Sequence, residues 1–351
     1  MNQKLWTRLL TASLLSGYFC VSLAPIPPMK NKIQATAEQY VEAKAECVME
    51  VNSRRVLYEL RGDKRLPMAS TTKILTATTI LENVPNLDKE ITIPIDATGI
   101  EGSSVYLQAG DIYKVRDLLY GLMLRSGNDC AVALALHCSG DIPRFATKMN
   151  ETAQKAGALA SNFKNPHGLP CPNHYTTSHD LTLITCYAMQ NPIFRSIVST
   201  RYYEPRHWKN KNKMLSLCDG SVGVKTGYTK EAGRCLVSAV ERDNMTLVCT
   251  VLGCPTTYER SIKLLDDAFS AYDYERLLSS DEIFIFDDGK TQAKADRDFY
   301  YPLLKEEKDL VKIRTKRKKS LKGKEKSGEI VGEFQIYLAK QLLFSGNLYK
   351  L

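Results

Sequence analysis

The chain has 351 residues, 44% hydrophobic and 25% charged, which is enough for one large domain and a small one with apolar cores. The net charge of +9 is concentrated, because segment 312–326 holds nine Lys and Arg against one acid, Glu325. The remainder is near neutral, so the composition argues against a nucleic-acid partner.

The N-terminal segment predicts export. Lys4 and Arg8 precede an apolar run, Leu9–Pro25, that is short for a membrane span, and Ala35–Ala37 offers small residues for cleavage. We therefore predict a signal peptide over residues 1–37, with an uncut N-terminal anchor as the alternative. Ten cysteines would suit disulfides in an exported protein, but several sit inside apolar runs and none forms a C-x-x-C pair, so we predict mostly free thiols.

Apolar periodicity predicts the elements of a large domain over residues 38–273. Cys47–Val51 and Val56–Leu60 form a hairpin pattern, and a helix begins behind Pro67. Further helices are predicted at Val115–Leu124, Asn128–Cys138, Ile142–Gly157, Asp180–Met189 (capped by Ser178) and Glu259–Tyr272, and strands at Cys235–Val240 and Thr246–Leu252. Strands at both ends with helices between predict an α/β (α+β) fold, in which helices cover one antiparallel sheet.

Short alternating runs replace the helical periodicity from about Leu277 and predict a small all-β domain over residues 277–351. The basic run Ile313–Lys319 has two interpretations: a surface for anionic lipid or wall polymer, or a solvated turn. The predicted strands are Ile283–Phe286, Phe299–Leu303, Ile330–Leu338 and Leu342–Leu348.

Ser70 and Lys73 suggest nucleophilic catalysis, because residues three apart share one helix face. A lysine held neutral can take the proton of a serine hydroxyl. Burial and a second cation lower a lysine pKa, and Lys225 is the candidate cation. For an isolated match the alternative is an exposed helix flank.

Ser126-Gly127-Asn128 follows in a predicted loop between two helices. Its hydroxyl and amide can hold Lys73, relay a proton to a leaving amine and bind a substrate amide. The alternative is an ordinary helix cap, which is compatible with those roles.

Lys225-Thr226-Gly227 lies at the mouth of a predicted edge strand. Such a strand can pair with an extended peptide, the Lys and Thr side chains can bind a terminal carboxylate, and the glycine permits close approach. Ser-x-x-K, S-x-N and K-T-G in this order are typical of serine acyl-transfer enzymes that recognise penicillin.

These motifs and their flanks resemble the D-alanyl-D-alanine carboxypeptidases, which are low-molecular-mass penicillin-binding proteins of serine peptidase family S11. The matching stretches span about residues 45–270: PMASTTKILTATTILEN, EGSSVYLQAGDIYKVRDLLYGLMLRSGNDCAVALA, NPHGLP followed by HYTTSHDL, and VGVKTGYTKEAGRCLVSA. The resemblance implies a penicillin-binding or serine β-lactamase-like domain with a C-terminal β domain. It also implies a cofactor-independent hydrolase of peptidoglycan biosynthesis and cell shape, at the extracellular face of the cytoplasmic membrane or in the wall.

The implied reaction removes the last D-alanine from a stem pentapeptide through an acyl-serine, and β-lactam antibiotics would acylate the same serine. The resemblance implies that Ser70 is the nucleophile, that Lys73 is the general base, and that Ser126, beside Asn128, is the proton relay. It places Lys225, Thr226 and Gly227 in substrate binding, and the N–H groups of Ser70 and Tyr228 in the oxyanion hole. Arg260, in a loose alignment, would bind the substrate carboxylate.

Other functions are weighed against this one. A class A β-lactamase needs a glutamate base, and the corresponding stretch Ser161–Asn173 has no acidic residue. A peptidoglycan D,D-endopeptidase stays open, whereas a non-catalytic wall-binding protein would not need every motif residue. His167, His174 and His179 form no H-E-x-x-H helix, so we predict no metal.

Overall fold

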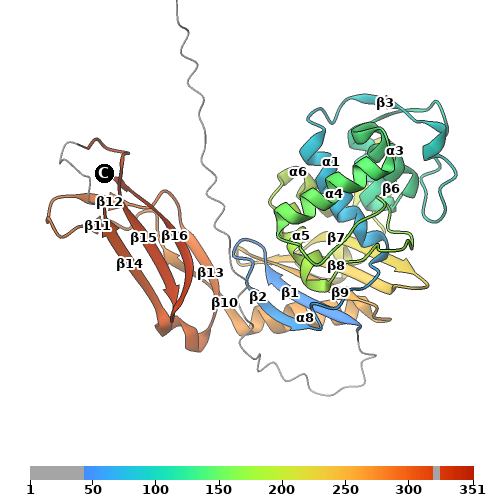
Figure 1. Cartoon of the computed structure of the whole chain (residues 1–351). Coiled ribbons are helices and arrows are strands. Elements are labelled where there is room, and N and C mark those ends of the chain that lie inside the picture. Colours follow the sequence, from blue (N-terminus) through green and yellow to red (C-terminus); the bar gives the residue numbers. More distant parts are fainter. Residues whose placement is uncertain (1–42, 319–324) are drawn as a thin grey trace, which may run out of the picture. The chain divides into compact units, whose positions relative to one another are not determined.

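The computed structural model describes residues 43–318 and 325–351, so the predicted signal peptide lies outside the described residues. A five-stranded antiparallel sheet with the order β2-β1-β9-β8-β7 forms the centre of the larger part (Figure 1). Segments from the two ends of this part meet in the sheet, as predicted, and β7 is an edge strand. The strands are β1 (Ala45–Glu50), β2 (Val56–Leu60), β7 (Ser221–Thr229), β8 (Gly233–Arg242) and β9 (Met245–Leu252).

Helices cover both faces of this sheet, which explains why every residue of β9 is buried. Alternate side chains of β9 point to opposite faces. Val248 packs with the core beneath α1, α3, α4 and α5, whereas Leu247 and Cys249 pack with α8. The helices are α1 (Lys73–Asn83), α2 (Val115–Tyr120), α3 (Asn128–Ser139), α4 (Ile142–Ala156), α5 (Ser178–Met189), α6 (Pro192–Ser199), α7 (Met214–Leu217) and α8 (Thr257–Ala271).

Local capping sets several helix ends. The Asp141 carboxylate accepts the Arg144 N–H at 2.7 Å where α4 begins, and Gly157, with φ 92°, follows its end. The Ser178 cap is wrong: Thr177 caps α5 by accepting the Asp180 N–H at 3.0 Å.

The helix predicted over Val115–Leu124 is divided into α2 and a π-helical turn, η3 (Gly121–Arg125). Other short elements that the periodicity missed connect the helices, because two- or three-residue strands are too short to show a pattern. They are β3 (Glu90–Thr92) with β4 (Ile112–Lys114), β5 (Tyr202–Tyr203) with β6 (Trp208–Lys209), and the 3₁₀ turns η1 (Ala69–Thr72), η2 (Ile95–Ala97) and η4 (Glu204–Arg206).

The C-terminal part is all-β apart from one 3₁₀ turn, η5 (Lys305–Leu310), as predicted. One sheet pairs β10 (Tyr272–Leu278) with β13 (Phe299–Leu304), and the other has the order β11-β12-β16-β15-β14. Phe299, Phe334 and Ile336 contribute to its core. The strands of the second sheet are β11 (Phe284–Ile285), β12 (Gln292–Lys294), β14 (Val311–Arg317), β15 (Ile330–Leu338) and β16 (Gln341–Lys350).

Much of the basic run is therefore a strand rather than a turn. Lys312, Arg314 and Lys316 are exposed, whereas Ile313 between them packs against the core. Exposure alternates over residues 311–314, and this alternation is lost at Thr315, so the strand is identified by its antiparallel pairing with β15.

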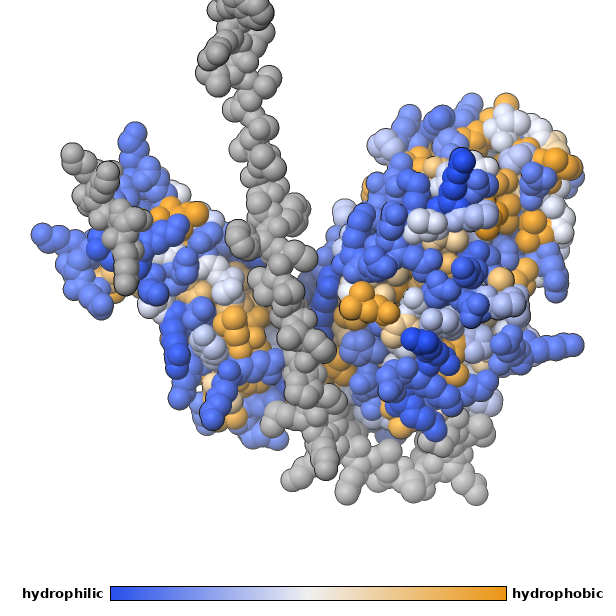
Figure 2. Space-filling model, in the orientation of Figure 1, coloured by the Kyte–Doolittle hydropathy of each residue, from blue (hydrophilic) through white to orange (hydrophobic). Residues whose placement is uncertain are grey.

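Figure 2 shows a face dominated by hydrophilic residues, on which hydrophobic residues form small scattered groups.

Within residues 43–318 and 325–351, no helix combines the length and apolarity needed to cross a bilayer. Seven of the nine cysteines in these ranges are buried, and free thiols predominate among them, as predicted.

Candidate active site

Ser70 lies in η1, directly before α1, and is partly exposed while its neighbours are buried. Ala69, the preceding residue, has φ 51°, which is a strained conformation for a residue with a side chain. Thr71 stabilises the turn, since its hydroxyl donates to the Met68 carbonyl oxygen at 2.6 Å. The strained turn presents the Ser70 hydroxyl at the head of a helix.

Lys73 is fully buried, and its Nζ lies 3.0 Å from Ser70 Oγ. The amine also donates to Asn128 Oδ1 and to the His167 carbonyl oxygen, both at 2.7 Å. None of these three partners is a carboxylate. Burial, followed by the nearby Lys225 cation, lowers the pKa of Lys73 well below its usual range. The site therefore favours an uncharged amine beside the hydroxyl.

Ser126 and Asn128 flank Gly127 between η3 and α3, as predicted. Ser126 is buried with φ 65°, and the Gly127 N–H returns to the Gly121 carbonyl oxygen at 3.1 Å. The Asn128 amide is fixed on both sides, because its Nδ2 donates to the Glu101 carbonyl oxygen at 2.5 Å. Its Oδ1 consequently faces Lys73.

Strand β7 brings the Lys225 motif to the Ser70 turn. An ideal Cβ on Gly227 would lie 3.1 Å from Ser70 N, so only glycine allows this approach without a shift. Lys225 is buried and donates to the Thr226 carbonyl oxygen at 2.9 Å, whereas Tyr228 is 66% exposed. Burial, with Lys211 nearby, lowers the pKa of Lys225 to about 7.

The loop at residues 165–174 closes the site from the other side. Besides the His167 carbonyl oxygen on Lys73, this loop places Gly168, with φ 89°, against the Ala69 carbonyl group. The His174 ring bridges Thr72 Oγ1 at 3.1 Å and the Lys164 N–H at 3.0 Å, and burial lowers its pKa to about 4. Sequence reasoning treated these histidines as loop residues. It missed that a backbone oxygen here binds the amine, which no side-chain pattern can reveal.

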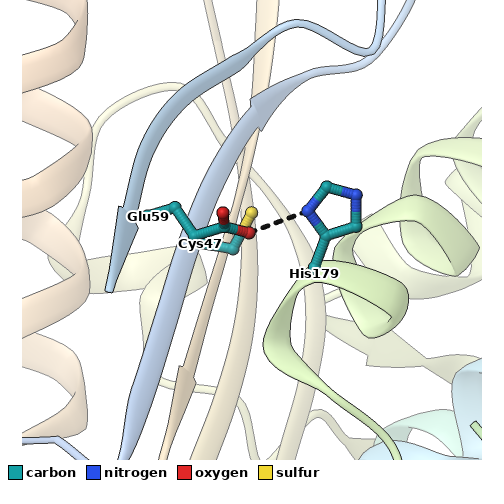
Figure 3. A group of neighbouring side chains, drawn as sticks. All are labelled: Cys47, Glu59 and His179. Atoms are coloured by element: carbon teal, nitrogen blue, oxygen red, sulfur yellow. Dashed lines mark hydrogen bonds and ion pairs between the residues drawn. The ribbon is translucent and has the colours of Figure 1, made fainter. Parts of the chain in front are cut away.

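The third histidine is separated from the other two and joins a different group (Figure 3). His179, at the start of α5, points toward Glu59 on β2 and Cys47 on β1, and the three donor atoms lie within 4.8 Å of one another. These residue types could hold a metal ion. However, His179 Nδ1 and Glu59 Oε1 already pair at 2.7 Å. Burial also raises the pKa of the Cys47 thiol well above its usual value. A metal needs the thiolate, so we interpret the group as an ion pair beside a core thiol.

Arg260 is not brought to the Ser70 group. It lies on α8, where its guanidinium donates to both carboxylate oxygens of Glu46 at 2.7 Å and to Tyr58 Oη at 3.2 Å. Glu46 is fully buried, so the arginine neutralises a carboxylate that has no access to water. We therefore assign Arg260 a structural role.

A helix-covered antiparallel sheet, with Ser-x-x-Lys, Ser-x-Asn and Lys-Thr-Gly gathered beside its edge strand, defines the class of penicillin-binding α/β domains. The chain matches D-alanyl-D-alanine carboxypeptidase over residues 31–256 and the penicillin-binding protein 5 C-terminal domain over residues 272–351. It belongs to the D-alanyl-D-alanine carboxypeptidase family, which confirms the family and the fold class that the motifs indicated.

Relatives agree with this membership. The chain is 32% identical to D-alanyl-D-alanine carboxypeptidase DacF of Bacillus subtilis, over 75% of this chain and 72% of the relative. It is 31% identical to DacA of Haemophilus influenzae, over 90% and 84%. The crystal structure of penicillin binding protein 5 from Haemophilus influenzae superposes with a TM-score of 0.74 at 28% identity, covering 90% of this chain and 98% of that one.

Proposed function

We propose that this protein is a serine-type D-Ala-D-Ala carboxypeptidase that removes the terminal D-alanine from peptidoglycan stem pentapeptides through an acyl-Ser70 intermediate. The observation that carries this proposal is the 3.0 Å separation of Lys73 Nζ from Ser70 Oγ in a site that lowers the lysine pKa. A neutral amine retains two N–H donors and gains one lone pair. It can donate to Asn128 Oδ1 and the His167 carbonyl oxygen while it accepts the Ser70 proton.

The proposed reaction has two steps. Ser70 Oγ attacks the carbonyl carbon of the penultimate D-alanine as its proton passes to Lys73, and the backbone N–H groups of Ser70 and Tyr228 stabilise the oxyanion. The C–N bond then breaks, and Ser126 relays the proton to the leaving amine of D-alanine. Water next attacks the ester with Lys73 accepting its proton, which releases the shortened peptide and restores the hydroxyl.

Substrate binding is assigned to the edge strand. An extended peptide can pair with β7 at Gly227, and the Lys225 ammonium with the Thr226 hydroxyl can bind the terminal carboxylate. A pocket of about 570 Å³, lined by residues 65–67, 170–175 and Glu231, supports a place for the remaining stem peptide. Pro67 precedes Ser70 by three residues and Glu231 follows Tyr228 by three, so the stem peptide can extend from β7 into this pocket.

Mass spectrometry of a stem pentapeptide incubated with the protein tests the reaction, with a fluorescent penicillin as a second readout. We expect loss of one alanine and stable labelling, both abolished in Ser70→Ala but retained in the exposed control Ser216→Ala. Rapid release of hydrolysed penicillin would instead indicate a β-lactamase, cleavage only of cross-linked dimers an endopeptidase, and absence of any label a wall-binding protein.

Export and contact with an anionic surface belong to the same proposal. Lys312, Arg314 and Lys316 project from one face of the edge strand β14, about 7 Å apart. Such a row suits anionic lipid headgroups or wall polymers. Salt-sensitive co-sedimentation with anionic vesicles or with isolated cell walls, weakened when all three become glutamine, would distinguish the two surfaces. Retention of both by the triple variant would contradict the proposal.

A further inference from the structure

Asp129 is a buried carboxylate beside the Ser126 motif, and the proposed chemistry gives it no role. It is 1% exposed. Its Oδ2 accepts the Ser104 hydroxyl at 2.5 Å and the N–H groups of Val105 at 3.0 Å and Leu107 at 3.1 Å. The Cys130 N–H donates to Oδ1 at 2.9 Å. One carboxylate therefore organises three residues of a loop that comes from a different part of the chain.

The same loop, residues 101–107, holds the Asn128 side chain. The Asn128 N–H donates to the Ser103 carbonyl oxygen at 2.7 Å, and its Nδ2 donates to the Glu101 carbonyl oxygen. A Cβ on Gly102 would lie 2.8 Å from that Nδ2, so the backbone packs directly against the amide. The loop lies against Asn128 at residues 101–103 and against Asp129 at residues 104–107.

We propose that Asp129 is a positioning residue for acylation, which clamps the 101–107 loop so that Asn128 Oδ1 stays on the Lys73 amine. This inference rests on the proposed serine mechanism. An amide free to rotate would present Nδ2 to Lys73 and place two donors face to face. With the loop clamped, the Glu101 carbonyl oxygen leaves only one orientation in which both ends of the amide are satisfied.

The charge of Asp129 adds a second, measurable effect. Lys225 and Lys211 lower the pKa of Lys73, while Asp129 and Cys130 oppose them, and His167 lies close enough to interact with the amine. Removing the Asp129 charge should therefore lower the Lys73 pKa further. Acylation requires the neutral amine, so its acid limb should move to lower pH. A carboxylate too distant to act on the Lys73 charge would not move this limb.

The test is the second-order rate constant for acylation by a fluorescent penicillin, measured against pH in the full chain. We expect Asp129→Asn to lower the plateau about 10- to 100-fold, because a displaced catalytic group costs about this much, and to shift the acid limb to lower pH. Asp129→Glu, which keeps the charge but alters the geometry, should lower the plateau without that shift.

Asp180→Asn is the matched control. This buried carboxylate also accepts a backbone N–H, from Ala160, and a serine hydroxyl, from Ser161, each at 2.7 Å. Asp180 is not among the groups that shift the pKa of Lys73. We expect Asp180→Asn to melt at a lower temperature than the wild type yet to keep the wild-type pH profile.

Ser104→Ala keeps the inference falsifiable if Asp129→Asn does not fold, since it removes one hydrogen bond from the carboxylate without changing charge. We expect a several-fold slower acylation, an unmoved acid limb and faster hydrogen exchange at Val105 and Leu107. Wild-type acylation by a folded Asp129→Asn or by Ser104→Ala, with the loop amides exchanging faster, would overturn the positioning role. Absence of labelling in the wild type would instead overturn the proposed serine chemistry.

Discussion

Gly168→Ala tests whether the 165–174 loop sets the position of the nucleophile. With φ at 89°, an added Cβ would lie 1.9 Å from the Ala69 carbonyl oxygen, which must retreat by about 1.5 Å to reach ordinary contact at 3.4 Å. That oxygen belongs to the peptide unit that leads into Ser70. We expect the left-handed conformation to cost about 1–2 kcal/mol and the overlap about 1–3 kcal/mol of folding stability. Displacement of Ser70 should slow acylation about 100-fold.

Gly157→Ala is the matched control, because Gly157 has φ 92° but its nearest atom to an added Cβ, Leu183 Cδ1, lies 3.9 Å away. This variant should lose only the conformational part of the stability and acylate at the wild-type rate. Denaturant unfolding and penicillin acylation, both at a temperature where each variant is folded, measure the two effects. If Gly168→Ala matched Gly157→Ala in both assays, the inferred contact between the loop and the Ser70 turn would be refuted.

Three further expectations follow from charged groups. Because the pKa of Lys225 is about 7, kcat/KM for a pentapeptide should fall above about pH 7 as the ammonium loses its proton. Lys225→Arg should remove this alkaline limb of the pH profile. If the limb stays in place in the variant, the titrating group is another residue. The hydrogen bond from Glu59 raises the pKa of His179, so their pair stabilises the fold fully below about pH 6.5 and progressively less as pH rises through the higher folded value. His179→Gln should therefore lower Tm by about 2–4 °C near pH 5 and by less near pH 9, and a difference that grows with pH would contradict the pairing. Arg260→Met should lower the free energy of unfolding, measured with denaturant, by about 3–5 kcal/mol, because it leaves buried Glu46 without its cation. KM should not change. A raised KM at unchanged stability would instead place Arg260 in the substrate site.

Local patterns predicted those parts of the fold that depend on neighbours in the chain. The hairpin of β1 and β2, the helices α3, α4 and α5, and the strand β15 follow from periodicity and turn chemistry, and the structure confirms them within a few residues. The basic strand β14 was left open because its exposed cations conceal the two apolar residues, Val311 and Ile313, that pack against the core. Arg260 was misplaced because an arginine in a helix looks the same whether it binds a substrate carboxylate or a buried glutamate.

The sequence by itself indicated that Ser70 and Lys73 lie together, because a helix was predicted behind Pro67 and residues three apart share one face of a helix. It also determined which residues accompany them, because the three motifs occur in one order. Only the tertiary structure decided that the pKa of this amine lies well below its usual range. That lowering depends on burial and on the approach of Lys225, while the Asn128 side chain and the His167 backbone fix the position of the amine. These contacts join segments remote in the chain, and a pKa responds to distance in space.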